Sequence, residues 1–170
     1  GYISARIHEA VKEAHAPVSD LSAAVDDTKM TVDQAYLLLY TAESRWWSRA
    51  GVSPAEATMG LTYAREARAA AVAELSKLRL VKMDSPLITG GDGVVRLTME
   101  NGADYAIEAE LKLTGENLSF PGGDRVPLDL QPGRTEILVE FTGEGGRQQI
   151  GAALVVGSTT LEEITRALNR

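Results

Sequence analysis

The spacing of apolar residues changes near residue 83. Before that point they recur every three or four positions, as in Ile7, Val11 and Ala14, which is typical of an amphipathic helix. Beyond it, apolar and polar residues alternate, which is typical of half-buried antiparallel strands. The sequence therefore predicts an α+β fold, with antiparallel helices over 1–82 followed by an antiparallel β-sandwich over 83–170.

Helix-starting and helix-ending residues divide the first half. Pro17 is expected to end the first helix, because proline lacks the backbone N–H that a helix interior needs. Thr31 to Gln34 and Ser53 to Glu56 each have the composition of a capping box. The connection between the last two helices is short, so these should pair as an antiparallel hairpin. The expected helices are about 3–15, 32–50 and 54–80.

Glycine-rich and proline-rich turns separate the alternating runs of the second half, as in a sandwich. Residues 160–168 are ambiguous, because Thr160 to Glu163 resembles a capping box and the apolar spacing that follows is helical. A sandwich needs a last edge strand, which favours a strand there. The other expected strands are 95–99, 107–114, 126–130, 136–141 and 148–156.

Composition narrows the classes of function. The 170 residues contain no cysteine, which excludes disulfides and cysteine-ligated zinc. No apolar run is long enough to span a membrane. Residues 1–82 hold 10 basic and 10 acidic residues, whereas residues 83–170 hold 7 and 14, so the net charge of −7 is expected to lie on the sandwich. An acidic surface argues against nucleic acid as a partner.

Two stretches resemble parts of known bacterial proteins. Val94 to Asn101, and Leu128 to Thr135 with its Pro-Gly turn, resemble immunoglobulin-like modules that accompany glycoside hydrolase domains and occur in envelope proteins. Leu38 to Trp47, with the alanine-rich helix after it, is similar to a C-terminal portion of large, poorly characterised bacterial secreted or envelope proteins. The resemblance implies an immunoglobulin-like sandwich, no catalytic residue, and a location in the cell envelope or outside the cell.

The two tryptophans are the main candidates for binding. Trp46 and Trp47 point about 100° apart if both are helical, so at most one can lie fully between two helices. The other could stack on a sugar or on a partner protein. Tyr40 shares a helix face with Tyr36 and Trp47. The candidate ligand-binding residues are therefore Trp46, Trp47 and Tyr40, although packing within the protein is the simpler interpretation.

Histidines and acidic residues give weaker signals. His8 and His15 are two helical turns apart, about 10 Å, which is too far for one metal ion. Glu43 is expected to form an ion pair with Arg65 or Arg68 of the next helix.

Asp92 and Asp124 each follow a Gly-Gly pair, a composition that can hold calcium. No Asp-x-Asp-x-Asp run accompanies them, so ordinary turns are the preferred interpretation. We expect no metal and no cofactor.

No nucleophile, base or metal set can be assembled from the spacing of residues, so no enzymatic activity is expected. The chain begins at Gly1 without a methionine, and we expect it to follow an upstream domain of the same polypeptide. The preferred hypothesis is a non-catalytic structural or interaction module, with that domain or another envelope protein as partner. The alternative is an accessory carbohydrate-binding module of a carbohydrate-active enzyme, with a glycan as ligand.

Overall fold

The chain folds into two compact units, Gly1–Leu75 and Ser76–Arg170. The computed structural model describes residues 5–25, 30–44, 47, 52–143 and 148–168. The first unit is helical and the second consists of two antiparallel sheets, which confirms the α+β class and the sandwich. The boundary after Leu75 lies earlier than the expected one after residue 82.

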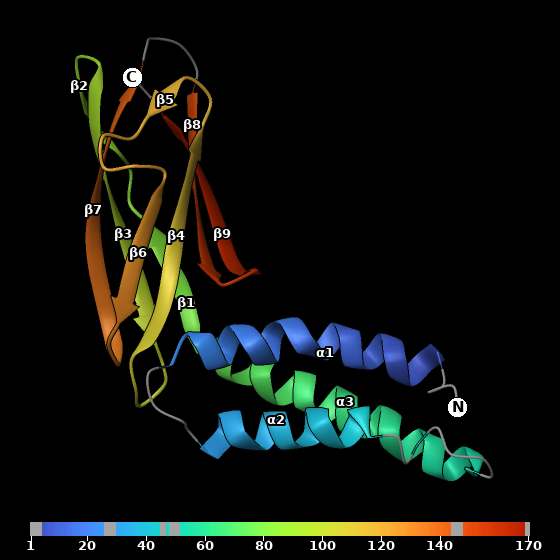
Figure 1. The fold of residues 1–170 in the computed structure, drawn as a ribbon. Coiled ribbons are helices and arrows are strands. Elements are labelled where there is room, and N and C mark those ends of the chain that lie inside the picture. The colour runs from blue at the N-terminus through green and yellow to red at the C-terminus, as the bar shows by residue number, and fades with distance from the viewer. Residues whose placement is uncertain (1–4, 26–29, 45–46, 48–51, 144–147, 169–170) are drawn as a thin grey trace. The chain divides into compact units, whose positions relative to one another are not determined.

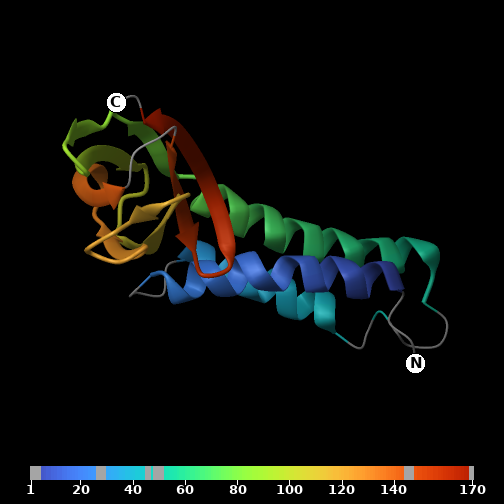
Figure 2. The same cartoon turned by 90° about the horizontal axis from the view of Figure 1, so that it is seen from above.

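The helical unit contains α1 (Ala5–Ala23), α2 (Met30–Glu43) and α3 (Pro54–Leu75). Figure 1 shows α2 running opposite to α1 and α3, and the three helices lie side by side in Figure 2. Small buried residues line the contact between them, with Ala10 on α1, Ala42 on α2 and Ala64 on α3 in one cluster. We call this cluster the alanine seam. Because methyl groups fill it, the helix axes can approach closely.

The prediction that Pro17 ends the first helix is wrong, because α1 continues to Ala23 with Pro17 inside it. Pro17 removes one backbone hydrogen bond, which disfavours a helix interior. Val18 and Leu21 follow it and are fully buried, so continuing the helix covers two large apolar side chains. Burying each of them contributes about 1.5–3 kcal/mol, enough to offset the lost hydrogen bond.

The third helix is five residues shorter than expected. It ends at Leu75, and Leu78–Met83 forms strand β1. The basic residues at 77, 79 and 82, which would also suit the C-terminus of a helix, therefore belong to the sandwich unit. With the boundary after Leu75, the first unit has 7 basic and 10 acidic residues and the second 10 and 14, so both units are acidic. The expected concentration of charge on the sandwich was an effect of the misplaced boundary.

The predicted helix starts had different outcomes. Ser53 and Glu56 form the expected capping box: the Ser53 N–H donates to Oε2 of Glu56 at 2.8 Å, and the Glu56 N–H donates to Oγ of Ser53 at 3.3 Å. Helix α2 instead starts at Met30, so Thr31 lies inside it. The helix ends at Glu43, and of the residues expected to extend it to position 50, 45–46 and 48–50 lie outside the described residues.

The sandwich unit has two antiparallel sheets. One has the order β1-β3-β7-β5, with β2 also paired to β3, and the other has the order β6-β4-β8-β9. The predicted edge strand at 160–168 is confirmed, because β9 pairs with β8 along its length. The remaining bounds are β2 Leu87–Thr89, β3 Asp92–Asn101, β4 Ile107–Gly115, β5 Leu118–Ser119, β6 Arg125–Leu130, β7 Gly133–Gly143, β8 Gln148–Val156 and β9 Thr159–Leu168.

Asn101 connects the ends of the two sheets. Its Nδ2 group donates to the carbonyl oxygens of Tyr105 at 2.8 Å and Leu130 at 2.7 Å, and its Oδ1 accepts from the Ala103 N–H at 2.9 Å. Only 2% of the residue is exposed. Because Asn101 ends β3 of one sheet and Leu130 ends β6 of the other, this buried amide fixes where the chain leaves β3.

Candidate functional site

Trp47, one of the three predicted binding residues, is part of the helical packing. Its indole Nε1 donates to the carbonyl oxygen of Thr41 at 2.7 Å, and its ring centroid lies 5.9 Å from that of Tyr63 on α3. A Cβ atom on Gly60 would lie 2.9 Å from Cγ of Trp47, so the ring packs directly against the glycine. With 9% of the residue exposed, Trp47 has no free ring face for a sugar. Trp46 lies outside the described residues.

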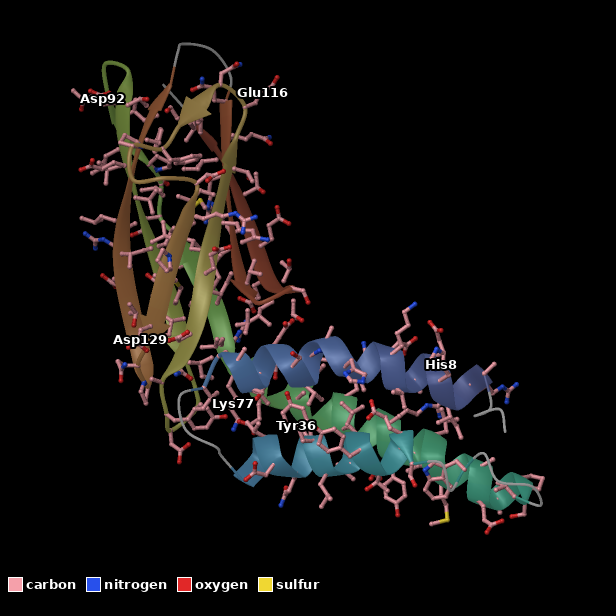
Figure 3. The ribbon with its side chains drawn as sticks, viewed as in Figure 1. His8, Tyr36, Lys77, Asp92, Glu116 and Asp129 are labelled. Atoms are coloured by element: carbon pink, nitrogen blue, oxygen red, sulfur yellow. The ribbon has the colours of Figure 1, made fainter. Side chains whose placement is uncertain are left out.

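Tyr40 is on the surface, apart from Trp47. It is 61% exposed, its neighbour Leu37 is 67% exposed, and its ring stacks on that of Tyr36 at 5.6 Å between centroids and 22° between planes. The predicted common face of Tyr36, Tyr40 and Trp47 does not form, because α2 ends at Glu43 and the Trp47 side chain turns inward. We call Tyr36, Leu37 and Tyr40 the α2 patch; Figure 3 labels Tyr36 on its helix.

Glu43 contacts a histidine rather than the expected Arg65 or Arg68. Oε1 of Glu43 lies 2.5 Å from Nε2 of His15. The two residues border a groove of about 450 Å³ between α1 and α2, together with His8, Val11 and Lys12. The side chains of His15 and Glu43 are 54% and 32% exposed, and pairs of that exposure contribute little to stability.

Metal binding gains no support from the geometry. No group of three or more histidine, aspartate and glutamate residues suited to a metal ion occurs among the described residues. Asp92 begins β3, opposite Thr89 and Thr142, and is labelled on the β2–β3 hairpin in Figure 3. The backbone carbonyl of Asp124 accepts from the Leu113 N–H at 2.8 Å, so this residue helps to start β6.

A hollow with a mixed polar and apolar lining lies at one end of the β4–β8–β9 sheet. It encloses about 730 Å³, and its lining includes the threonines at 114 and 165, Glu116 and Gln149. Gly151 is required at its floor, because a Cβ there would lie 2.4 Å from Oγ1 of Thr114. The described lining has no aromatic ring, and Glu116 is its one charged side chain.

Asp84 of the sandwich unit forms an ion pair at the surface. Its carboxylate lies 2.5 Å from Nζ of Lys82, and the hydrogen bond from Lys82 lowers the pKa of Asp84. The charges of Lys82, Arg96 and Arg166 act in the same direction. Asp84 is therefore an ionised partner in a surface pair, not a proton donor near neutral pH.

One structurally important side chain had no signal in the sequence. Glu162 of β9 accepts from the backbone N–H of Leu80 at 2.8 Å and from Nε of Arg79 at 3.1 Å, both on β1 of the other sheet. The interacting residues are 82 and 83 positions apart. No pattern of local spacing predicts such a contact.

Comparisons with known proteins give no family. No family model matches the chain, and no curated protein matches it. A solved structure assigned as a beta-galactosidase from Bacteroides fragilis is 12% identical, with a TM-score of 0.40, over 56% of this chain and 16% of that one. A conjugative transposon lipoprotein from Bacteroides eggerthii is 14% identical, with a TM-score of 0.36, over 55% and 95%.

A FixG-related protein from Vibrio parahaemolyticus is also similar, with 14% identity and a TM-score of 0.41 over 52% of this chain and 94% of that one. Likenesses of this size neither define a family nor indicate a function. No helix among the described residues is long and apolar enough to cross a membrane.

Proposed function

We propose that the chain is a non-catalytic interaction module of a larger bacterial envelope or secreted protein, and that the α2 patch is its binding surface. The observation that carries the proposal is the exposure of Leu37 and Tyr40 on a helix whose opposite face is buried. Leu39 and Ala42 on that opposite face are fully buried, so α2 packs against its neighbours through a different face from the one that carries Leu37 and Tyr40. Exposed apolar and aromatic residues that are grouped on one face are typical of protein interaction sites.

The strand order supports an immunoglobulin-like sandwich. In such folds the first, second and fifth strands share one sheet, and the third, sixth and seventh share the other. If the short strands β2 and β5 are left out of the count, the first, second and fifth strands here are β1, β3 and β7, which pair in one sheet. The third, sixth and seventh are β4, β8 and β9, which pair in the other sheet, with β6 at the edge beside β4. The fold is a frequent scaffold for binding, but it does not itself specify a ligand.

The polar side chains support a module without catalysis. Asn101 joins strand ends, Glu162 links β9 to β1, and Ser53 and Glu56 start α3. Each of these groups forms hydrogen bonds that hold the fold together. A catalytic site would instead direct such groups toward a shared substrate position.

The test is capture of a partner with the immobilised chain from the envelope fraction of the source bacterium. We expect a defined protein to be retained by the wild type and lost with Leu37→Asp/Tyr40→Ser. Val72→Asp is the matched control, because Val72 is also an exposed apolar helix residue, 42% exposed on α3. Retention of the same protein by the patch variant, or a cytosolic location of the parent protein on cell fractionation, would overturn the proposal.

A carbohydrate-binding role is the second candidate, and the stacked Tyr36–Tyr40 pair is the observation that favours it. An exposed aromatic ring can bind the face of a sugar. Titration with oligosaccharides, followed by intrinsic fluorescence, separates the two roles. Sugar binding requires the ring, so Tyr40→Ala should abolish it while Leu37→Ala leaves it unchanged, whereas docking of a protein should weaken with both substitutions.

A further inference from the structure

The edge of β7 is open over most of its length. Its register with β3 runs without interruption from Gly133 to Thr142. On the other side of β7, β5 pairs only with Thr142 and Gly143. Within the described part of the chain, the backbone from Arg134 to Phe141 therefore has no strand on that side.

The other edges of the sandwich are interrupted. In β1 the register shifts at Val81, and the N–H of Leu80 is already bonded to Glu162. In β9 the register shifts at Leu161, and β6 contains Pro127. Bulges and prolines prevent an edge from pairing with another strand. Among the four edges, only that of β7 has neither a bulge nor a proline.

Side chains along β7 are incompletely covered. Val139 is buried, whereas Ile137, which points to the same face, is half-buried. On the outer face, Leu138 is 66% exposed. A strand added beside β7 would cover both Ile137 and Leu138, and its backbone would satisfy the N–H and C=O groups of that edge.

The charges of β7 are complementary to those of a second β7. In an antiparallel pair of β7 strands related by a two-fold axis, the axis passes either through one residue or between two residues. Only an axis through one residue places side chains of the same sheet face opposite each other. Centring on Leu138 places Glu136 opposite Glu140, which is repulsive. Centring on Ile137 places Arg134 opposite Glu140 at both ends, and both residues are exposed.

We propose that two copies of the chain associate through their β7 edges, antiparallel and centred on Ile137, so that the β1-β3-β7 sheet continues into the second copy. Arg134 of each copy faces Glu140 of the other, and the two Ile137 side chains cover each other. This inference is independent of the α2 patch, because it uses a different unit and a different surface.

The test is sedimentation equilibrium of the intact chain up to about 1 mM, because a single strand pair gives a small interface and a weak dimer. We expect the wild type to rise from 18.2 kDa toward twice that mass. Arg134→Glu alone and Glu140→Arg alone should each raise the dissociation constant about tenfold, because each creates two like-charge pairs per dimer. The double variant Arg134→Glu/Glu140→Arg restores the opposite-charge pairs, so its dissociation constant should return to within about threefold of wild type.

Glu108→Arg is the matched control, since Glu108 is an exposed glutamate on β4, and its dissociation constant should equal that of the wild type. Arg134 also lies opposite Glu100 of β3, so Arg134→Glu changes the folded monomer as well. The double variant keeps that change, and recovery of its dimer therefore reports the contact between copies. A wild type that stays monomeric, or a double variant as weak as the single variants, would overturn the proposal.

Discussion

At the scale of single residues, the polar side chains that matter most hold backbone groups in place. Asn101 satisfies three backbone groups from a position that is almost completely buried. In such a position, the cost of removing a side chain comes mainly from the donors and acceptors that are left unsatisfied.

We expect Asn101→Ala to lower the free energy of unfolding of the sandwich by about 3 kcal/mol, because it leaves the Ala103 N–H and two carbonyl groups without their partner. Urea denaturation measures the change. Gln131→Ala is the control, because that amide bonds to Asp129 at the surface, and it should cost less than about 0.5 kcal/mol. An equal effect of the two substitutions would show that Asn101 does not fasten the sheets.

The lowered pKa of Asp84 predicts that the stability of the folded state depends on pH. Its pKa is lower in the folded state, so its contribution is fully present above the unfolded-state pKa near 3.8 and is lost as the pH falls through the folded-state pKa. The difference in stability between wild type and Asp84→Asn should therefore shrink as the solution is acidified through this range. NMR titration should show that Lys82→Gln raises the pKa of Asp84 more than Arg96→Gln does; the reverse order would contradict the assignment of Lys82 as the main cause.

At the scale of elements, most of the long strands were predictable from the sequence, but β1 was not. Alternation located β3, β4, β6 and β7, because a half-buried strand has to alternate. The nearly continuous apolar run from Ile150 to Val156 located β8. It missed β1, where six residues follow an alanine-rich helix and contain basic residues that also suit a helix end. Leu78, Leu80 and Met83 become buried only when β3 lies beside them, and a local pattern contains no information about that partner.

The candidate site was less predictable than the fold. From the sequence, Trp47 and Tyr40 were expected to lie on one face of a helix, because a single continuous helix was assumed to contain both residues. The end of α2 at Glu43 separates them: Trp47 packs against Gly60, and Tyr40 stays in solvent. Where a helix ends within an aromatic-rich stretch depends on the neighbouring helix, which is a tertiary effect.

The contact between β9 and β1 gives a prediction for Glu162. Glu162→Ala should cost about 1–2 kcal/mol, because the Leu80 N–H loses a charged acceptor. Hydrogen exchange of the Leu80 amide should accelerate together with this loss. The neighbouring Glu163→Ala is the control on the same strand, and a loss of stability as large as that of Glu162→Ala would argue against a specific link between β9 and β1.

The contact of Gly60 with Trp47 predicts an unusual response in a helix. Alanine normally stabilises a helix by about 1 kcal/mol relative to glycine. Here a Cβ would lie 2.9 Å from Trp47 Cγ and 3.1 Å from Ile7 Cδ1, so Gly60→Ala should destabilise the helical unit by about 1–3 kcal/mol. Thermal unfolding tests this, with exposed Thr62→Ala on the same helix as control. Stabilisation by Gly60→Ala would mean that Trp47 is not held against α3.

At the scale of the whole molecule, each compact unit has its own buried residues. Leu39 is fully buried in the helical unit and Leu111 in the sandwich. Units with separate cores are able to unfold in separate transitions. The composition of the two halves indicated this division, although it placed the boundary too late.

We expect Leu39→Ala and Leu111→Ala each to cost about 3 kcal/mol, and each to lower the midpoint of one calorimetric transition only. Leu39→Ala should affect the helical unit and Leu111→Ala the sandwich, as judged from helical and strand signals in circular dichroism. A single transition that moves with both substitutions would show that the two units unfold as one.

The alanine seam has a consequence for how this chain can change in evolution. Positions 10, 42 and 64 hold methyl groups where three helices meet, so a larger residue at any one of them has to force apart two neighbours at once. Homologues should therefore vary freely in the chemistry of the solvent-facing helix positions but conserve small volume at these three. A compensated pair, larger on one helix and glycine on the facing helix, would be the signature of divergence within the bundle.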